Sequence, residues 1–164
     1  MMRWLRHLFA PSVQRLFPPQ SLQRIAAAIA EGERQHSGEV MFAVESALAP
    51  GALWAGVQAR QAAEAAFARL RTWDTQANNG VLIYLLLADH RIEIVADRGL
   101  TGKVAPEEWQ AVCAQVEAGM RQGQPEAAVI AGIRAASALL ARSFPARPGD
   151  PGRNELPDLP QVLE

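Results

Sequence analysis

Residues 78–99 constrain the fold of this chain more than any other part of its sequence. Residues 81–87 form an unbroken apolar run, with Asn79-Gly80 before it and Asp89-His90 after it. This pattern predicts a strand that leads into a tight hairpin, and residues 92–96 alternate in polarity as a second strand does. A strand without alternation is buried on both faces, so we expect helices on both sides of the sheet.

The rest of the chain supplies those helices and one more strand. We predict helices over residues 20–35, 50–72, 106–122 and 125–142, and a strand over 39–46. The order strand, helix, strand defines a βαβ unit, whose crossover makes the first two strands parallel, while the hairpin makes the third antiparallel. The predicted fold class is α/β: a three-layer α/β/α sandwich with a small mixed sheet and helices on both faces.

We divide the chain into an arm over residues 1–18, a domain over 19–143 and a tail over 144–164. The tail holds five prolines and two glycines, so we expect it to be disordered. A net charge of -1 offers nucleic acid no general attraction, and the single cysteine excludes an internal disulfide. No stretch approaches the ~20 apolar residues that a membrane-spanning helix needs.

The N-terminal arm combines apolar and basic residues without a signal-peptide core. One helical face could hold Leu5, Leu8, Phe9, Val13 and Leu16, opposite Arg3, Arg6 and Arg15. We interpret the arm either as a membrane-surface anchor or as a segment that docks on the domain, because Pro11 interrupts the apolar face. His7 and His36 have no evident partner and are predicted at the surface. The expected location is cytoplasmic, with peripheral membrane contact as an extension.

The strand directions bring polar residues together at two opposite rims of the sheet. We call one the Asp89 rim (Glu45, Ser46, Asp89 and His90) and the other the Asn79 rim (Asp74, Thr75, Asn78, Asn79, Asp97 and Arg98). Carboxylate and amide oxygens suit Ca²⁺ or Mg²⁺, so the predicted metal ligands are Asp74, Asn79 and Asp97. Arg98 could hold a phosphate, and Thr75, Asn78 and Glu45 are further candidate ligand contacts. Alternatively, residues 74–80 form only a turn, Asp97 and Arg98 are a solvated pair, and Asp89-His90 is only the hairpin turn.

These motifs resemble a known family. Ser37-Gly38-Glu39-Val40, then Asn79-Gly80-Val81-Leu82-Ile83, Asp89 and Arg98-Gly99-Leu100 are similar to the TPM domain, the family of the thylakoid-lumen photosystem II repair protein and of many bacterial envelope proteins. The resemblance covers residues 19–144. It implies an α/β/α sandwich, and relatives are described as acid phosphatases or as binders of divalent metals. Where relatives place an acidic residue at a helix start, this chain has Pro106, so a metal site does not transfer directly.

Two functions follow as hypotheses. The first is a non-catalytic TPM-type interaction module that binds a protein partner. Two extensions of this hypothesis are a bound divalent cation and a partner that is anchored in a membrane. The alternative is a weak metal-dependent phosphomonoesterase at the Asn79 rim. The sequence has no nucleophile motif, glycine-rich phosphate loop or histidine pair at metal spacing, so this activity would depend on a metal-bound water.

Overall fold

The computed structural model describes residues 2–149 and 154–164 of the chain. Its elements are α1 (Arg3–Leu8), α2 (Val13–Leu16), α3 (Pro19–Glu33), β1 (Glu39–Glu45), α4 (Pro50–Trp54), α5 (Ala59–Arg69), β2 (Gly80–Leu86), β3 (Arg91–Ala96), a 3-10 turn (Arg98–Leu100), α6 (Pro106–Arg121), α7 (Pro125–Ser143) and β4 (Gln161–Leu163). Within these described residues no helix is long and apolar enough to cross a membrane.

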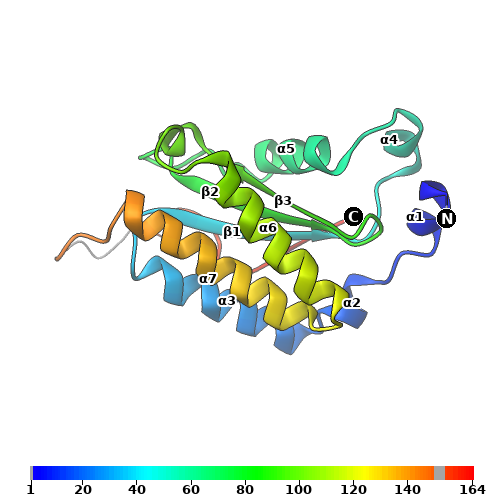
Figure 1. Ribbon diagram of the computed structural model, residues 1–164, viewed down its shortest axis with the longest axis horizontal. Coiled ribbons are helices and arrows are strands. Elements are labelled where there is room, and N and C mark those ends of the chain that lie inside the picture. The colour runs from blue at the N-terminus through cyan, green and yellow to red at the C-terminus, as the bar shows by residue number, and fades with distance from the viewer. Residues whose placement is uncertain (1, 150–153) are drawn as a thin grey trace.

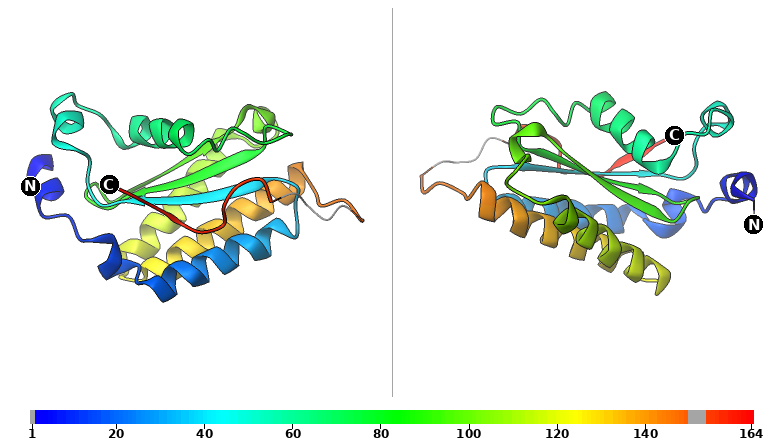
Figure 2. Two further views of the ribbon diagram at one scale, coloured as in Figure 1. Left: turned by 180° about the vertical axis from the view of Figure 1, so that it is seen from behind. Right: turned by 45° about the horizontal axis from the view of Figure 1, so that its top comes forward.

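The sheet has the predicted mixed topology. Its strand order is β3-β2-β1-β4, with β1 parallel to β2 and β2 antiparallel to β3. Glu39 pairs with Gly80 at one end of β1 and Glu45 with Leu86 at the other. The three-layer fold is confirmed: α3, α6 and α7 cover one face, α5 covers the other, and α4 lies on the side of α5 beyond the end of the sheet (Figures 1 and 2).

The two faces of β1 and β2 contribute to two separate cores. Phe42 and Ile83 point into the core beneath α3 and α7, whereas Met41 and Tyr84 point into the core beneath α5. On α5 the buried positions are all alanines (Ala59, Ala63 and Ala66), which lets this helix approach the sheet closely. Burial on both faces explains why the apolar run of β2 has no polar alternation.

The predicted single helix over residues 50–72 is wrong, because the chain breaks it into α4 and α5. α4 ends at Trp54, and Gly56 follows in a left-handed conformation with φ of 72°. That conformation suits glycine and interrupts the helical hydrogen bonds. Gln58 and Gln61 then form a capping box that starts α5 afresh.

Both chain ends differ from the predicted arm and tail. Val13 and Phe17 are buried, and Phe17 packs edge-on against Phe42 with ring centroids 6.1 Å apart, so the second half of the arm belongs to the core. The tail was expected to be disordered, but its last residues form β4, which pairs with the free edge of β1. Leu156 and Leu163 supply enough buried apolar surface to hold it. Residues 150–153, also covered by the prediction, lie outside the described residues.

Candidate functional site

Asn79 and Thr75 stabilise the entry to β2. The Asn79 side chain is buried, and its Nδ2 donates a hydrogen bond to the Ser37 carbonyl at 2.9 Å, across to the start of β1. The Thr75 hydroxyl accepts a hydrogen bond from the Asn79 backbone N–H at 3.1 Å. These bonds satisfy backbone groups that would otherwise be buried without a partner. The predicted ligand Asn79 therefore uses its amide N–H within the fold.

Asn78, Asp97 and Arg98 hold the neighbouring loop at the exit of β3. Asn78 adopts φ of 51°, and its Oδ1 accepts a hydrogen bond from Arg98 Nε at 3.2 Å. Asp97 Oδ1 accepts a hydrogen bond from the Arg98 backbone N–H at 2.7 Å. The other carboxylate oxygen, Asp97 Oδ2, is buried and has no hydrogen-bond partner. Among the predicted metal ligands in the described residues, it is the buried side-chain oxygen that has no hydrogen-bond donor.

The three predicted metal ligands bond to different partners. Asp74 is exposed and forms an ion pair with Arg71, with Oδ2 and Nη2 2.6 Å apart. Asn79 bonds to the start of β1 and Asp97 to its own loop, as described above. Across residues 2–149 and 154–164, no three His, Cys, Asp or Glu side chains are grouped to hold a metal ion. The donors at this rim are of the type that Ca²⁺ and Mg²⁺ use, but their side chains are not bonded to one another.

An acidic cluster (Glu33, Glu39, Glu155 and Asp158) lies at the same end of the sheet. Glu33 accepts a hydrogen bond from the Val40 N–H, and Glu39 accepts one from the Leu156 N–H in the tail. Burial, followed by the charges of Glu39 and Asp158, raises the pKa of Glu33 to about 8. Burial, followed by the charges of Glu155 and Asp158, raises the pKa of Glu39 to about 7. This cluster bonds the segment before β4 to the start of β1 and favours protonated carboxyl groups.

At the Asp89 rim, one carboxylate connects the hairpin turn to α1. Asp89 accepts hydrogen bonds from Arg3, with Nη2 and Oδ2 2.7 Å apart, and from His7, with Nε2 and Oδ1 3.1 Å apart. His7 Nδ1 accepts a hydrogen bond from the Leu48 N–H at 3.0 Å, so the proton of the neutral ring is on Nε2, which donates to Asp89. Burial opposes ionisation of Asp89, but the bonds from Arg3 and His7 outweigh it and hold its pKa below the usual value.

Of the other residues predicted at this rim, two form hydrogen bonds with neighbouring segments and one lies in the hairpin turn. Glu45 accepts a hydrogen bond from the Tyr84 hydroxyl at 2.5 Å, and burial followed by this bond raises the Tyr84 pKa. The Ser46 hydroxyl donates to the Pro11 carbonyl at 2.9 Å. His90 occupies the hairpin turn with φ of 52°. The predicted ligand Glu45 is thus 39 positions from its partner in sequence but bonded to it across β1 and β2.

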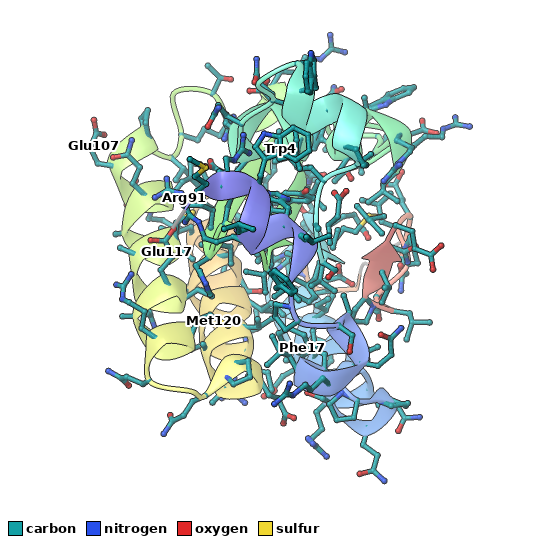
Figure 3. All side chains as sticks on the ribbon, turned by 90° about the vertical axis from the view of Figure 1, so that its right-hand side faces the viewer. Trp4, Phe17, Arg91, Glu107, Glu117 and Met120 are labelled. Atoms are coloured by element: carbon teal, nitrogen blue, oxygen red, sulfur yellow. The ribbon has the colours of Figure 1, made fainter. Side chains whose placement is uncertain are left out.

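The Arg3–His7–Asp89 cluster directs polar residues of α1 toward the domain and leaves apolar residues exposed, the reverse of an ordinary surface helix. His7 and His36 are only 7% and 3% exposed, which corrects the surface position predicted for both. In contrast, Leu8 and Phe9 are each 73% exposed. Trp4 meets Trp54 of α4 edge-on, with ring centroids 6.1 Å apart, and Trp54 is 85% exposed. We call the exposed set of Trp4, Leu5, Leu8, Phe9 and Trp54 the α1–α4 platform. Figure 3 looks onto this end of the molecule, with Trp4 between α1 and α4.

Sequence reasoning missed Trp54 and the role of His7. The helix break at Gly56, which exposes α4, was hidden in an apparently continuous helical pattern. One signal for His7 was present: Arg3 and His7 are four positions apart and therefore share a helical face. Their acceptor, Asp89, lies more than 80 positions away and was predicted at the correct rim, but without a partner.

A pocket of about 520 Å³ lies along the free edge of β3, lined by Arg60, Asp97, Trp109 and Cys113 among others. Burial, followed by the charges of Glu93 and Glu117, raises the pKa of the Cys113 thiol to about 11. A protonated thiol is a poor nucleophile, so Cys113 is unsuited to covalent catalysis near neutral pH.

The mixed sheet, its crossover and the paired rims define an α/β/α domain of the TPM type. The chain belongs to the TPM domain family, whose sequence pattern matches residues 13–139.

Several solved structures are similar to this chain, and two of them are described here. The BA42 protein from the psychrophilic bacterium Bizionia argentinensis is 24% identical, with a TM-score of 0.79 over 93% of this chain and 99% of that one. The N-terminal domain of a P. gingivalis protein is 16% identical, with a TM-score of 0.61 over 79% of each chain. At these identities the likeness concerns the fold alone. No protein with a curated description matches this chain.

Proposed function

We propose that this chain is a non-catalytic TPM-domain module that binds a partner through the α1–α4 platform. The observation that carries the proposal is the orientation of α1: Arg3 and His7 face the domain, while Leu8 and Phe9 face solvent. Burying a large apolar side chain is worth about 1.5–3 kcal/mol. A helix held with its apolar face outward therefore keeps that binding free energy available for a partner.

The free edge of β3, an alternative surface for protein binding, is partly occupied by side chains. The carbonyl of Ile94 at the free edge of β3 accepts a hydrogen bond from Arg60 at 2.6 Å. The Ile92 N–H on the same edge donates to Glu117 at 3.4 Å. Side chains thus occupy backbone groups that an added strand would need, which is how proteins protect an exposed strand.

The described residues offer little for covalent catalysis. His7 uses both ring nitrogens within the fold, and the buried His36 bonds through Nδ1 to the Gly38 carbonyl at 2.9 Å. Within residues 2–149 and 154–164, no Ser, Thr or Cys side chain is hydrogen-bonded to either. An activated nucleophile needs such a base beside it.

To test this proposal, a photo-crosslinking amino acid would replace Trp54 in the full chain, expressed in cells. We expect adducts from position 54 that disappear when Leu8 and Phe9 are changed to serine. The control is the same replacement at Trp73, which is 46% exposed and follows α5, away from the platform. Equal adducts from positions 54 and 73, or none from 54 to either protein or lipid, would remove the platform as the binding surface.

A second candidate function has one specific observation in its favour. Asp97 Oδ2 is buried without a partner beside Arg98, and a divalent cation at the Asn79 rim would satisfy it. Such a cation is the requirement of the phosphomonoesterase alternative, with Asp74 and Asn79 as the other predicted ligands. Binding there would require Asp74 to leave Arg71.

Thermal melts with Ca²⁺, Mg²⁺ or Mn²⁺ test this second candidate, because a ligand of the folded state raises Tm with its concentration. The cation role predicts a rise that Asp97→Asn abolishes. The cation role is rejected if none of the three cations changes Tm. The phosphatase role further predicts hydrolysis of an aryl phosphate, and activity that survives both Asp97→Asn and Asp74→Asn would exclude this rim as its site.

A further inference from the structure

We infer that the partner of the α1–α4 platform is the surface of an anionic lipid bilayer. This inference rests on the proposed function and names the chemistry of what the platform binds. Three features of the described residues support a bilayer over a protein: the charges around the platform, its aromatic pair and its shape.

The charged residues within the two segments that carry the platform are basic, whereas the acidic Glu45 and Glu164 lie at the same end of the sheet. Residues 1–18 contain Arg3, Arg6, Arg15 and His7 and no Asp or Glu, and residues 46–58 contain no charged residue. Asp89, which contacts α1, forms an ion pair with Arg3 and accepts a further hydrogen bond from His7. Arg6 is half-buried and forms no ion pair with any described residue, and its buried Nε lacks a hydrogen-bond partner. A cation beside an apolar surface is the pairing that anionic headgroups over acyl chains attract.

The exposed side chains are of the type found at membrane interfaces. Tryptophan is enriched at this boundary because its ring is apolar and its N–H is polar. Trp4 and Trp54 come from separate helices, yet they pack edge-on at the same end of the molecule. Leu8 and Phe9 extend the apolar surface along α1. This combination of aromatic, leucine and arginine residues is typical of helices that lie in the membrane interface.

The shape of the platform suits a flat surface. α1 and α4 project together beyond the end of the sheet, and all three views agree on this placement (Figures 1 and 2). Two pockets among the described residues lie elsewhere, one beside the acidic cluster and the other along β3, and neither is lined by a platform residue. A peptide partner typically fills a groove, whereas a projecting apolar end fits insertion into a bilayer.

The Arg3–His7–Asp89 cluster fixes the orientation of the inserted face. A six-residue helix is too short to form alone in water, so α1 depends on these bonds for its structure. Because Arg3 and His7 of α1 bond to the domain, the apolar face of α1 is already ordered before it meets the membrane. Binding then costs less conformational entropy than folding the helix at the surface would.

The test is sedimentation of the full chain with vesicles of phosphatidylcholine alone or mixed with an equal part of phosphatidylglycerol. We expect binding to the mixed vesicles, weakened by added salt, and much weaker binding to phosphatidylcholine alone. Leu8→Ala combined with Trp54→Ala should lower the partition coefficient about a hundredfold, at roughly tenfold for each side chain. Arg6→Gln should lower it about fivefold.

Two controls keep folding and binding apart. Leu8 and Trp54 are 73% and 85% exposed, so the double variant should keep the wild-type thermal melt. Trp73→Ala removes an exposed tryptophan at the opposite rim and should leave vesicle binding unchanged. Wild-type protein that stays in the supernatant with mixed vesicles would overturn the inference, and so would equal losses in the Trp73 and platform variants.

Failure of this inference is distinguishable from failure of the proposed function. No vesicle binding together with Trp54 crosslinks to a protein would reject the lipid surface and keep the platform as a binding site. No vesicle binding and no crosslinks would reject both.

Discussion

At the Asp89 rim, one carboxylate bonds to two side chains of a distant helix, whereas at the Asn79 rim each polar side chain bonds to its own loop or to the adjacent strand start. The carboxyl groups also differ in ionisation. Arg3 and His7 lower the pKa of Asp89, but burial raises those of Glu33 and Glu39 at the other end. Carboxylates therefore hold an exposed apolar helix in place at the Asp89 rim, whereas at the other end they bond neighbouring segments of the fold to each other.

This contrast shows why a cluster of polar residues is weak evidence for a site. Both rims collect carboxylates, and both were candidates by composition. What separates them is what the bonds leave exposed: at the Asp89 rim they leave an apolar helix face in solvent, and at the Asn79 rim they leave a single buried oxygen of Asp97. Four predictions test this comparison, from the largest expected effect to the smallest.

Asp89→Ala should destabilise the fold by about 2–3 kcal/mol, because it removes the shared acceptor of Arg3 and His7 and leaves the buried His7 N–H unpaired. Urea unfolding measures this loss. A cost below ~0.5 kcal/mol would mean that the cluster does not hold α1, and the contrast between the rims would fail.

His7→Ala should cost about 1–2 kcal/mol, because the Leu48 N–H loses its acceptor as well as Asp89 its donor. The matched control is His90→Asn, since His90 is exposed and asparagine tolerates its positive φ. The same urea experiment applies to both. Equal effects of the two substitutions would contradict the assigned role of His7.

The two ends should respond oppositely to pH. Folded Glu33 and Glu39 have raised pKa values, so the stability from their protonated forms is complete below the ordinary value of 4.5 and is lost as pH rises through about 7 to 8. Asp89 has a lowered pKa, so its contribution is complete above 3.8 and is lost only as pH falls below that.

Glu33→Gln should therefore flatten the decline in Tm between pH 5 and 8, because glutamine can still accept the Val40 N–H without a charge. Melts of both proteins across this range measure the difference. Identical slopes would show that Glu33 is not protonated in the folded state.

Asp97→Asn should have the smallest effect, within ~0.5 kcal/mol, because asparagine can accept the Arg98 N–H and the other carboxylate oxygen has no partner to lose. Urea unfolding without added metal measures it. A loss of unfolding free energy comparable to that of Asp89→Ala would mean that the Asp97 charge stabilises the fold. The proposed difference between the Asn79 rim and the Asp89 rim would then be wrong.

Much of the fold follows from local sequence pattern. The apolar run of β2 requires helices on both faces, and the proline starts of α6 and α7 mark those helices directly. β4 was missed because three residues are too few to show alternation, and its pairing depends on the free edge of β1. The Arg3–His7–Asp89 cluster was missed because its contacts join residues more than 80 positions apart, which no local pattern reveals.

Amide hydrogen exchange at Phe9, whose N–H donates to the Leu5 carbonyl at 3.0 Å, most directly measures whether the Asp89 rim orders α1 with its apolar face outward. We expect protection of this amide in the wild-type chain and its loss in Asp89→Asn, with the amides of β2 protected in both. An unprotected Phe9 amide in the wild type, or protection that survives Asp89→Asn, would contradict this account.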